Sequence, residues 1–332
     1  MELNEPTRRR ALEWIGAALA AVAWTPRAGA TDAAPAPFPT RPIKLWIPWP
    51  PGGATDLTLR MLAEGAGQRL GQRIVIDNRA GVGGTLVMPI LAKSAPDGYT
   101  IGQMPQTVFR APWTQDVAWD PIRDTTPVIQ ISGVTFGILV PAGSPLRSVD
   151  ELFDWARRHP GELTLATNGV GTTPHVVMER LFRERGIGWI HVPFKGTAEQ
   201  MVAVPSALVM AGVNASGFAP FVDSGQLRLL ATLGAERPRR WPQVPTLREL
   251  GYGVVATSAY GIAGPAGMPG VVVRILHDAF KAAMHEPGYI AELAKHDQVL
   301  DYLGPEDYGR AMRAAYAAER EAVERQGLGR RE

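Results

Sequence analysis

Residues 42–64 read PIKLWIPWPPGGATDLTLRMLAE, and this stretch predicts how the rest of the chain is arranged. The apolar run 43–47 predicts a buried strand. The prolines that follow end it, because each lacks a backbone N–H and fixes φ. A glycine pair then allows a tight turn, and a helix is predicted to begin at Thr55 or Asp56, both good N-caps.

A strand that passes through a glycine turn into a helix leaves several backbone N–H groups directed at one point. These donors and the helix dipole together favour an anion at that point. An ordinary strand–turn–helix connection without a ligand has the same sequence features. The stretch by itself therefore leaves both interpretations open.

Composition excludes several classes of protein. With 332 residues, 45% of them hydrophobic, the chain is long enough for two domains. The 34 Lys+Arg nearly balance the 32 Asp+Glu, and no basic stripe with interleaved aromatics indicates nucleic-acid binding. The 6 His show no ligand spacing, no Gly-x-Ser-x-Gly elbow is present, and there are 0 Cys. We therefore expect no catalytic residues, no metal site and no cofactor.

The N-terminal 30 residues are typical of an export signal. Residues 7–12, TRRRAL, precede a short apolar run and a small-x-small cleavage pattern at 28–30. The arginines resemble the twin-arginine type of signal. Residues 31–39 are predicted to be a disordered leader. No later segment reaches the roughly 20 apolar residues that span a bilayer, so we expect a periplasmic protein that is not embedded in the membrane.

The remaining chain alternates strands with helices, which is typical of an α/β fold with parallel sheets. Two long extended runs interrupt this alternation, at 128–141 and 254–263. They predict two lobes joined by two crossing strands, with a ligand cleft between the lobes. The predicted lobes are 40–134 with 258–332, and 135–257. The other predicted strands are 74–76, 99–102, 163–167, 189–194, 208–213 and 227–233, and the last predicted helices are 270–283, 286–296 and 305–326.

With these pieces in order, the chain resembles the TctC/Bug family of periplasmic solute receptors, which serve tripartite tricarboxylate transporters. The resemblance runs from about residue 38 to residue 328. Its most specific motifs are FPTRPIK at 38–44 and PPGGATD at 50–56. Supporting motifs are NR at 78–79, GVGGT at 81–85, APDGYT at 95–100, GTTPH at 171–175, PFKG at 193–196, YG at 260–261 and PAG at 265–267.

The resemblance implies a two-lobed type II periplasmic-binding-protein fold that closes on a small organic carboxylate. It also implies membrane permease subunits as partners. The ligand-binding residues that it implies on the first lobe are Trp49, Gly53, Ala54, Thr55, Asp56, Gly83, Gly84 and Thr85. Those that it implies on the second lobe are Gly171, Thr172, Thr173 and His175.

The sequence departs from the family pattern at several positions. Two acids usual in the family are replaced by Val209 and Val213, and an apolar-Asn-Pro motif reads Arg110-Ala111-Pro112. An added arginine near the cleft would favour a more acidic or more aromatic ligand, but a surface charge is the preferred interpretation of Arg110.

Several individual residues have a structural role as an alternative to ligand binding. His175 could cap its loop as a neutral imidazole instead of contacting a ligand. Asp56 is predicted to be an N-cap in preference to a ligand residue, because a carboxylate repels an anion. Trp46 is predicted to lie in the core, and Tyr308, Met312 and Tyr316 to form a helix packing face.

The leading functional hypothesis is a non-catalytic, monomeric receptor that hands a small organic anion to a permease. A receptor that presents its closed form to a membrane signalling partner has the same sequence features. An exported hydrolase is disfavoured by the missing catalytic motifs.

Overall fold

A computed structural model describes residues 38–326, which belong to one compact unit beginning at Phe38. The predicted export signal and nearly all of the predicted leader lie outside the described residues. Phe38 itself is not part of a disordered leader: its ring packs edge-on against Tyr99, with centroids 5.0 Å apart. Among the helices of residues 38–326, none has the length and apolar character needed to cross a membrane.

The strands join into one sheet in the order β2-β1-β3-β9-β4-β7-β5-β6, with β8 and β10 paired to β4. The pairs β1–β2, β1–β3, β5–β6 and β5–β7 are parallel. The strands are β1 (Ile43–Ile47), β2 (Ile74–Asn78), β3 (Thr100–Met104), β4 (Thr125–Pro141), β5 (Thr164–Thr167), β6 (Ile190–Pro193), β7 (Ala211–Ala215), β8 (Leu227–Thr232), β9 (Thr257–Pro265) and β10 (Val299–Leu303).

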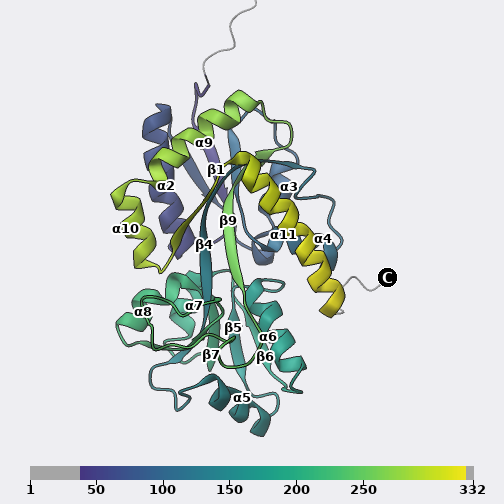
Figure 1. Ribbon diagram of the computed structural model, residues 1–332, viewed down its shortest axis with the longest axis vertical. Coiled ribbons are helices and arrows are strands. Elements are labelled where there is room, and N and C mark those ends of the chain that lie inside the picture. The colour runs from purple at the N-terminus through teal and green to yellow at the C-terminus, as the bar shows by residue number, and fades with distance from the viewer. Residues whose placement is uncertain (1–37, 327–332) are drawn as a thin grey trace, which may run out of the picture. The chain divides into compact units, whose positions relative to one another are not determined.

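Strand β4 connects two groups of elements (Figure 1). Its first part pairs with β9 and β10, and its second part, from Phe136 onward, pairs with β7 and β8. We call the elements β1–β3, β9 and β10 with their helices lobe one, and β5–β8 with their helices lobe two. The residue boundaries 40–134 with 258–332 and 135–257 stay a prediction, because β4 runs through both lobes without a break.

The helices cover both faces of the sheet. In lobe one, α9 and α10 pack with α2, and α11 packs with α4 (Figure 1). The helices of lobe one are α2 (Ala54–Leu70), α3 (Val87–Leu91), α4 (Thr107–Thr114), α9 (Gly270–Met284), α10 (Pro287–Lys295) and α11 (Pro305–Gln326), and those of lobe two are α5 (Val149–Arg158), α6 (Thr173–Arg183), α7 (Thr197–Ala203) and α8 (Ala219–Asp223).

The apolar strands build the core as the sequence predicts. Ile43, Leu45 and Ile47 of β1 are fully buried. Trp46 between them is only partly buried, and Lys44 and Arg79 lie over its ring. The predicted packing face of α11 is confirmed: Tyr308 and Met312 are buried, and the ring of Tyr316 lies 4.7 Å from that of Trp113.

Some element bounds differ from prediction. The strand expected at 208–213 is displaced to β7, since the chain first completes the end of α7: Leu208 N donates to Ala203 O, with Ala207 at a φ of 58°. The second extended run becomes strand only from Thr257, after Ala256 N donates to Leu233 O. Helices α4 and α8 and strand β10 were not predicted.

Candidate functional site

A cavity lies where the loops of both lobes meet the crossing strands β4 and β9. The cavity is lined by Trp49, Pro50, Gly53, Ala54, Thr55, Asp56, Gln103, Pro105, Gln106, Thr107, Val134, Phe136, Asn168, Thr172, Thr173, Pro174, Thr197, Ala215, Ser258 and Tyr260.

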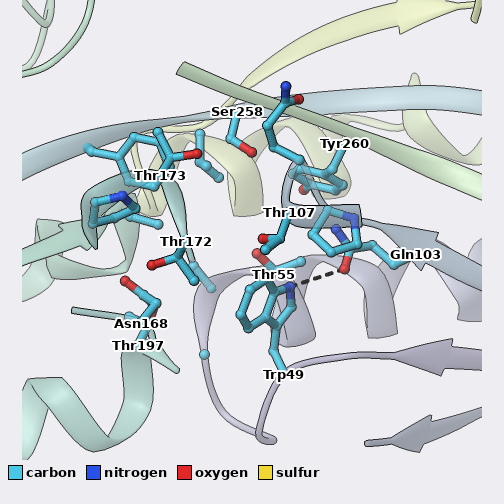
Figure 2. A pocket seen from close by; sticks show the side chains of 18 of the residues that line it. Trp49, Thr55, Gln103, Thr107, Asn168, Thr172, Thr173, Thr197, Ser258 and Tyr260 are labelled. Carbon is cyan, nitrogen blue, oxygen red and sulfur yellow. Dashed lines mark hydrogen bonds between the residues drawn. The ribbon is translucent and has the colours of Figure 1, made fainter. Parts of the chain in front are cut away.

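The lining is polar but almost without charge. Figure 2 shows hydroxyl and amide side chains from both lobes around the space, with Ser258 and Tyr260 contributed by β9. Val134 and Phe136 of β4, the Trp49 ring and several prolines supply apolar surface. Asp56 is the one charged side chain among the described residues that line it. Burial raises the pKa of Tyr260, whose hydroxyl stays protonated and donates to Gln298 Oε1 at 3.2 Å.

Helix α2 begins at the cavity. Its N-cap is Gly53 in an extended conformation, so the helix starts at Ala54, earlier than the predicted Thr55 or Asp56. The first intrahelical hydrogen bond runs from Leu57 N to Gly53 O at 3.0 Å. The N–H groups of the first turn precede this bond and have no acceptor within the helix. Together with the helix dipole they favour an anion in the cavity.

Asp56 holds the glycine turn in place instead of capping the helix. Its carboxylate is 1% exposed and accepts from Gly52 N at 2.9 Å, Arg60 Nε at 2.9 Å and Asn78 Nδ2 at 2.8 Å. These three donors bond both carboxylate oxygens, and one of the donors, Arg60, also carries the opposite charge. The carboxylate is therefore compensated, and it leaves the neighbouring N–H groups free to attract an anion.

Lobe two presents a second helix start to the same cavity. Helix α6 has Thr172 at its N-cap and Pro174 at its second position, and its first intrahelical hydrogen bond runs from Val176 N to Thr172 O at 3.0 Å. Thr172 and Thr173 line the cavity. Their hydroxyls bond Gly169 O and the Arg110 guanidinium, so they do not cap the free N–H groups of α6.

The residues that follow the parallel strands complete the lobe-two wall. Asn168 Nδ2 donates to Thr197 Oγ1 at 3.2 Å and to Asn214 Oδ1 at 3.3 Å, and Thr197 Oγ1 donates to Asn214 Oδ1 at 2.9 Å. This network fixes Asn168 and Thr197, the first residue of α7, at the cavity (Figure 2).

The predicted glycine loop supports the site from outside the lining. A Cβ on Gly84 would lie 2.9 Å from Trp49 Cη2, so only glycine lets the loop pack against the indole ring. A Cβ on Gly83 would lie 2.8 Å from Val170 O in lobe two, and its φ of 60° also favours glycine. The loop thus contacts both the Trp49 ring and the opposite lobe.

His175 caps its own loop. Gly171 N donates to His175 Nδ1 at 3.2 Å, and the imidazole stacks on His191 with centroids 4.2 Å apart. Burial lowers the pKa of His175, and the nearby Arg110 charge lowers it further, against the opposing effect of Glu179. His175 is therefore neutral with Nδ1 as an acceptor, which is one of the two roles that the sequence left open for it.

Arg110 is not a surface charge, contrary to the preferred prediction. Arg110 is 6% exposed, and its guanidinium forms a two-bond ion pair with Glu319 of α11, from Nε at 2.7 Å and from Nη2 at 2.8 Å. It was placed wrongly because α4, which buries it, was not predicted. Arg110 also does not line the cavity.

The predicted ligand residues divide into two groups. The residues that line the cavity are Trp49, Gly53, Ala54, Thr55, Asp56, Thr172 and Thr173, whereas Gly83, Gly84, Thr85, Gly171 and His175 do not line it. Ligand binding by these residues stays a prediction. Val209 and Val213, at the positions of the usual acids, are buried in the core and do not line the cavity.

Several lining residues were missed. Asn168 and Thr197 follow strands of lobe two as the glycine turn follows β1, so the same strand–loop–helix rule could have found them. Gln103 and Thr107 flank the end of β3 and could have been found in the same way. Ser258 and Tyr260 have no local signal, because their place depends on how β9 pairs with β4. Residues 38–326 contain no group of three or more acidic or His side chains suited to a metal ion.

Two lobes joined by crossing strands, with helix N-termini facing a shared cavity, define the class of periplasmic binding proteins, as predicted. A model of the tripartite tricarboxylate transporter family receptor, TctC, matches residues 58–328. The chain belongs to this family, a family of solute-binding receptors.

Curated relatives agree with this assignment. A Cupriavidus necator protein described as "UPF0065 protein in gbd 5'region" is 40% identical over 291 residues, covering 88% of this chain and 89% of the relative. Protein BugT of Bordetella pertussis is 31% identical over 263 residues, covering 77% and 80%.

Solved structures share the fold. The R. palustris protein Rpa4515 with adipate has a TM-score of 0.81 at 28% identity, covering 88% of this chain and 99% of that chain. MatC from Rhodopseudomonas palustris with bound malate has a TM-score of 0.80 at 25% identity, covering 86% and 100%.

Proposed function

We propose that this receptor captures a small organic carboxylate between its lobes and delivers it to the permease of a tripartite tricarboxylate-type transporter. The observation that carries the proposal is the approach of two helix N-termini, α2 and α6, to one cavity from opposite lobes. No Lys or Arg is among its described lining residues, so backbone N–H groups and hydroxyls would hold the anion.

The ligands of the solved relatives support a carboxylate. Adipate and malate are the ligands named for Rpa4515 and MatC. Here the polar lining with an apolar Trp49–Phe136 side would accept a carboxylate group attached to a carbon skeleton.

Capture would work by population shift. A ligand that contacts α2 of lobe one and α6 of lobe two gains both sets of contacts only when the lobes are closed, so it stabilises the closed form. The permease would then recognise this form. The protein would act in the periplasm, after export directed by residues 1–30, and it would have no catalytic activity of its own.

Ligand binding is tested by thermal unfolding and calorimetry of the chain from residue 31 onward. The panel contains adipate, malate, tricarboxylates, aromatic acids and amino acids, each paired with its neutral amide. A ligand at 100 times its Kd should add about 2.7 kcal/mol to the free energy of unfolding. Carboxylates should bind and their amides should not; equal responses to acid and amide would contradict the anion site.

A backbone variant tests the role of α2. Ala54→Pro removes the Ala54 N–H at the first helical position, where proline is well tolerated, and the preceding Gly53 is already extended. Unfolding of the free protein should change little, while carboxylate affinity should fall at least about tenfold. Unchanged affinity would mean that the α2 terminus does not hold the anion. Delivery is tested by ligand uptake into vesicles that contain the permease.

A further inference from the structure

The buried guanidinium of Arg110 joins the two lobes. On lobe one, Nε and Nη2 bind the two carboxylate oxygens of Glu319, and Gln106 Nε2 also donates to Glu319 at 2.9 Å. The other donors cross to lobe two: Nη1 donates to Gly171 O at 2.7 Å and Nη2 to Thr173 Oγ1 at 3.4 Å. One side chain therefore contacts α11 and the start of α6 at once.

The contacts of Arg110 with Glu319 lie within lobe one, whereas its contacts with lobe two require the lobes to be together. Arg110 and Glu319 both belong to lobe one, on the packed helices α4 and α11, so their ion pair survives any separation of the lobes. The bonds to Gly171 and Thr173 exist only when the lobes are together. Glu319 fixes the planar guanidinium in a rigid two-bond geometry, and the remaining N–H groups are thereby aimed at lobe two.

We infer that Arg110 is a latch for the closed form: held by Glu319, it binds Gly171, just before α6, and Thr173, its first residue, across the cleft and thereby sets the balance between closed and open protein. It is a positioning residue, since it does not line the cavity. By holding Gly171 O and Thr173 Oγ1 it also orients the loop that carries the N–H groups of α6 toward the cavity. This inference goes beyond ligand capture and does not depend on the ligand's identity.

The test measures the distance between the lobes without ligand. The chain contains 0 Cys, so spin labels can be placed at Ala314→Cys on α11 and at Glu184→Cys, the C-cap of α6. Both positions are exposed, and the two helices flank one groove beside Arg110. Pulsed electron resonance then gives the distribution of distances across the latch.

The main variant is Arg110→Met with Glu319→Gln. It removes both buried charges at once, which proteins often tolerate, whereas removing Arg110 alone leaves a buried carboxylate unpaired. The matched control is Glu319→Gln alone, whose amide oxygen can still accept one of the two hydrogen bonds that position the guanidinium, so that the bonds of Arg110 to lobe two can persist. Thr173→Val is a milder variant that removes one cross-lobe acceptor and leaves the ion pair intact.

The wild type should show a short-distance population. The double variant should lower the ratio of closed to open protein about tenfold or more, because it loses hydrogen bonds to a charged group. Glu319→Gln should keep the short distance, and Thr173→Val should reduce it in part.

Three results would overturn the latch: a wild type without the short distance, a double variant with the wild-type distribution, or a Glu319→Gln distribution like that of the double variant. If the double variant does not fold, Thr173→Val decides the question, and an unshifted distribution would count against the latch. Because no ligand is present, these results are independent of whether the cavity binds a carboxylate.

Discussion

The indole Nε1 of Trp49 donates to Oε1 of Gln103 at 3.0 Å, and this bond ties the turn after β1 to strand β3 (Figure 2). Gln103 is 2% exposed, so its amide oxygen cannot replace this bond with one from bulk water. The orientation of the Trp49 ring in the cavity therefore depends on a residue more than fifty positions away in the chain.

This pair predicts a coupled loss of stability. Gln103→Leu leaves the indole N–H unpaired and should lower the free energy of unfolding by about 1–3 kcal/mol. Trp49→Phe should have a separate cost, because it leaves the Gln103 amide unpaired. The double variant should cost less than the sum of the two, since both polar groups are then gone. Urea unfolding of all four proteins checks this, and strict additivity would contradict it.

Closure should be sensitive to one glycine. A Cβ on Gly196 would lie 2.6 Å from Cδ of Pro50 on lobe one. Gly196 has an extended backbone, so Gly196→Ala adds no conformational strain and acts by this contact alone. We expect ligand affinity to fall about tenfold or more with little change in unfolding of the free protein. Gly143→Ala, with no atom within 4 Å of its Cβ, is the matched control and should bind as the wild type does.

The glycine turn should depend on Asp56. Asp56→Ala removes three hydrogen bonds to a buried carboxylate, one of them from Arg60, and should cost about 3–5 kcal/mol of stability. Arg60→Met keeps the other two donors and should cost clearly less, because the Arg60 side chain is partly exposed. Chemical unfolding compares the two; equal losses would show that the carboxylate acts only through Arg60.

Stability should fall in mild acid because of the stacked imidazoles. Burial lowers the pKa of His191 to about 4, with a further contribution from His175, whose own pKa is also lowered. Between pH 6.5 and about 4 the unfolded chain therefore binds more protons than the folded one, and the free energy of unfolding decreases as the pH falls. Above pH 6.5 the stabilisation is complete, and below about 4 His191 causes no further loss.

The size of this effect is limited by solvent. Each histidine should contribute well below the ~1.4 kcal/mol per pH unit of a fully buried group, because His191 is only half-buried. His191→Gln should flatten the profile over this range. His285→Gln, at an exposed position, is the control and should leave it unchanged. An unaltered slope in His191→Gln would contradict the assignment.

Local patterns were sufficient for much of the fold. The apolar run of β1, the prolines after it and the glycine pair specify a strand, a stop and a turn within a few residues, and the structure has all three. Most of β4 followed from the extended run at 128–141, although the strand begins earlier, at Thr125. Elements with weak or mixed patterns were missed: α4 contains Pro112, and β10 is a short, partly exposed strand that pairs with β4.

By itself the sequence determined the α/β class, the family and the helix terminus that faces the cavity, because these depend on neighbouring residues and short motifs. Only the tertiary structure decided which side chains surround the cavity and what Arg110 does. Ser258 and Tyr260 reach the cavity through strand pairing, and Glu319 reaches Arg110 through helix packing, in both cases between segments far apart in the chain. Such contacts depend on the whole packed core, which no local spacing specifies.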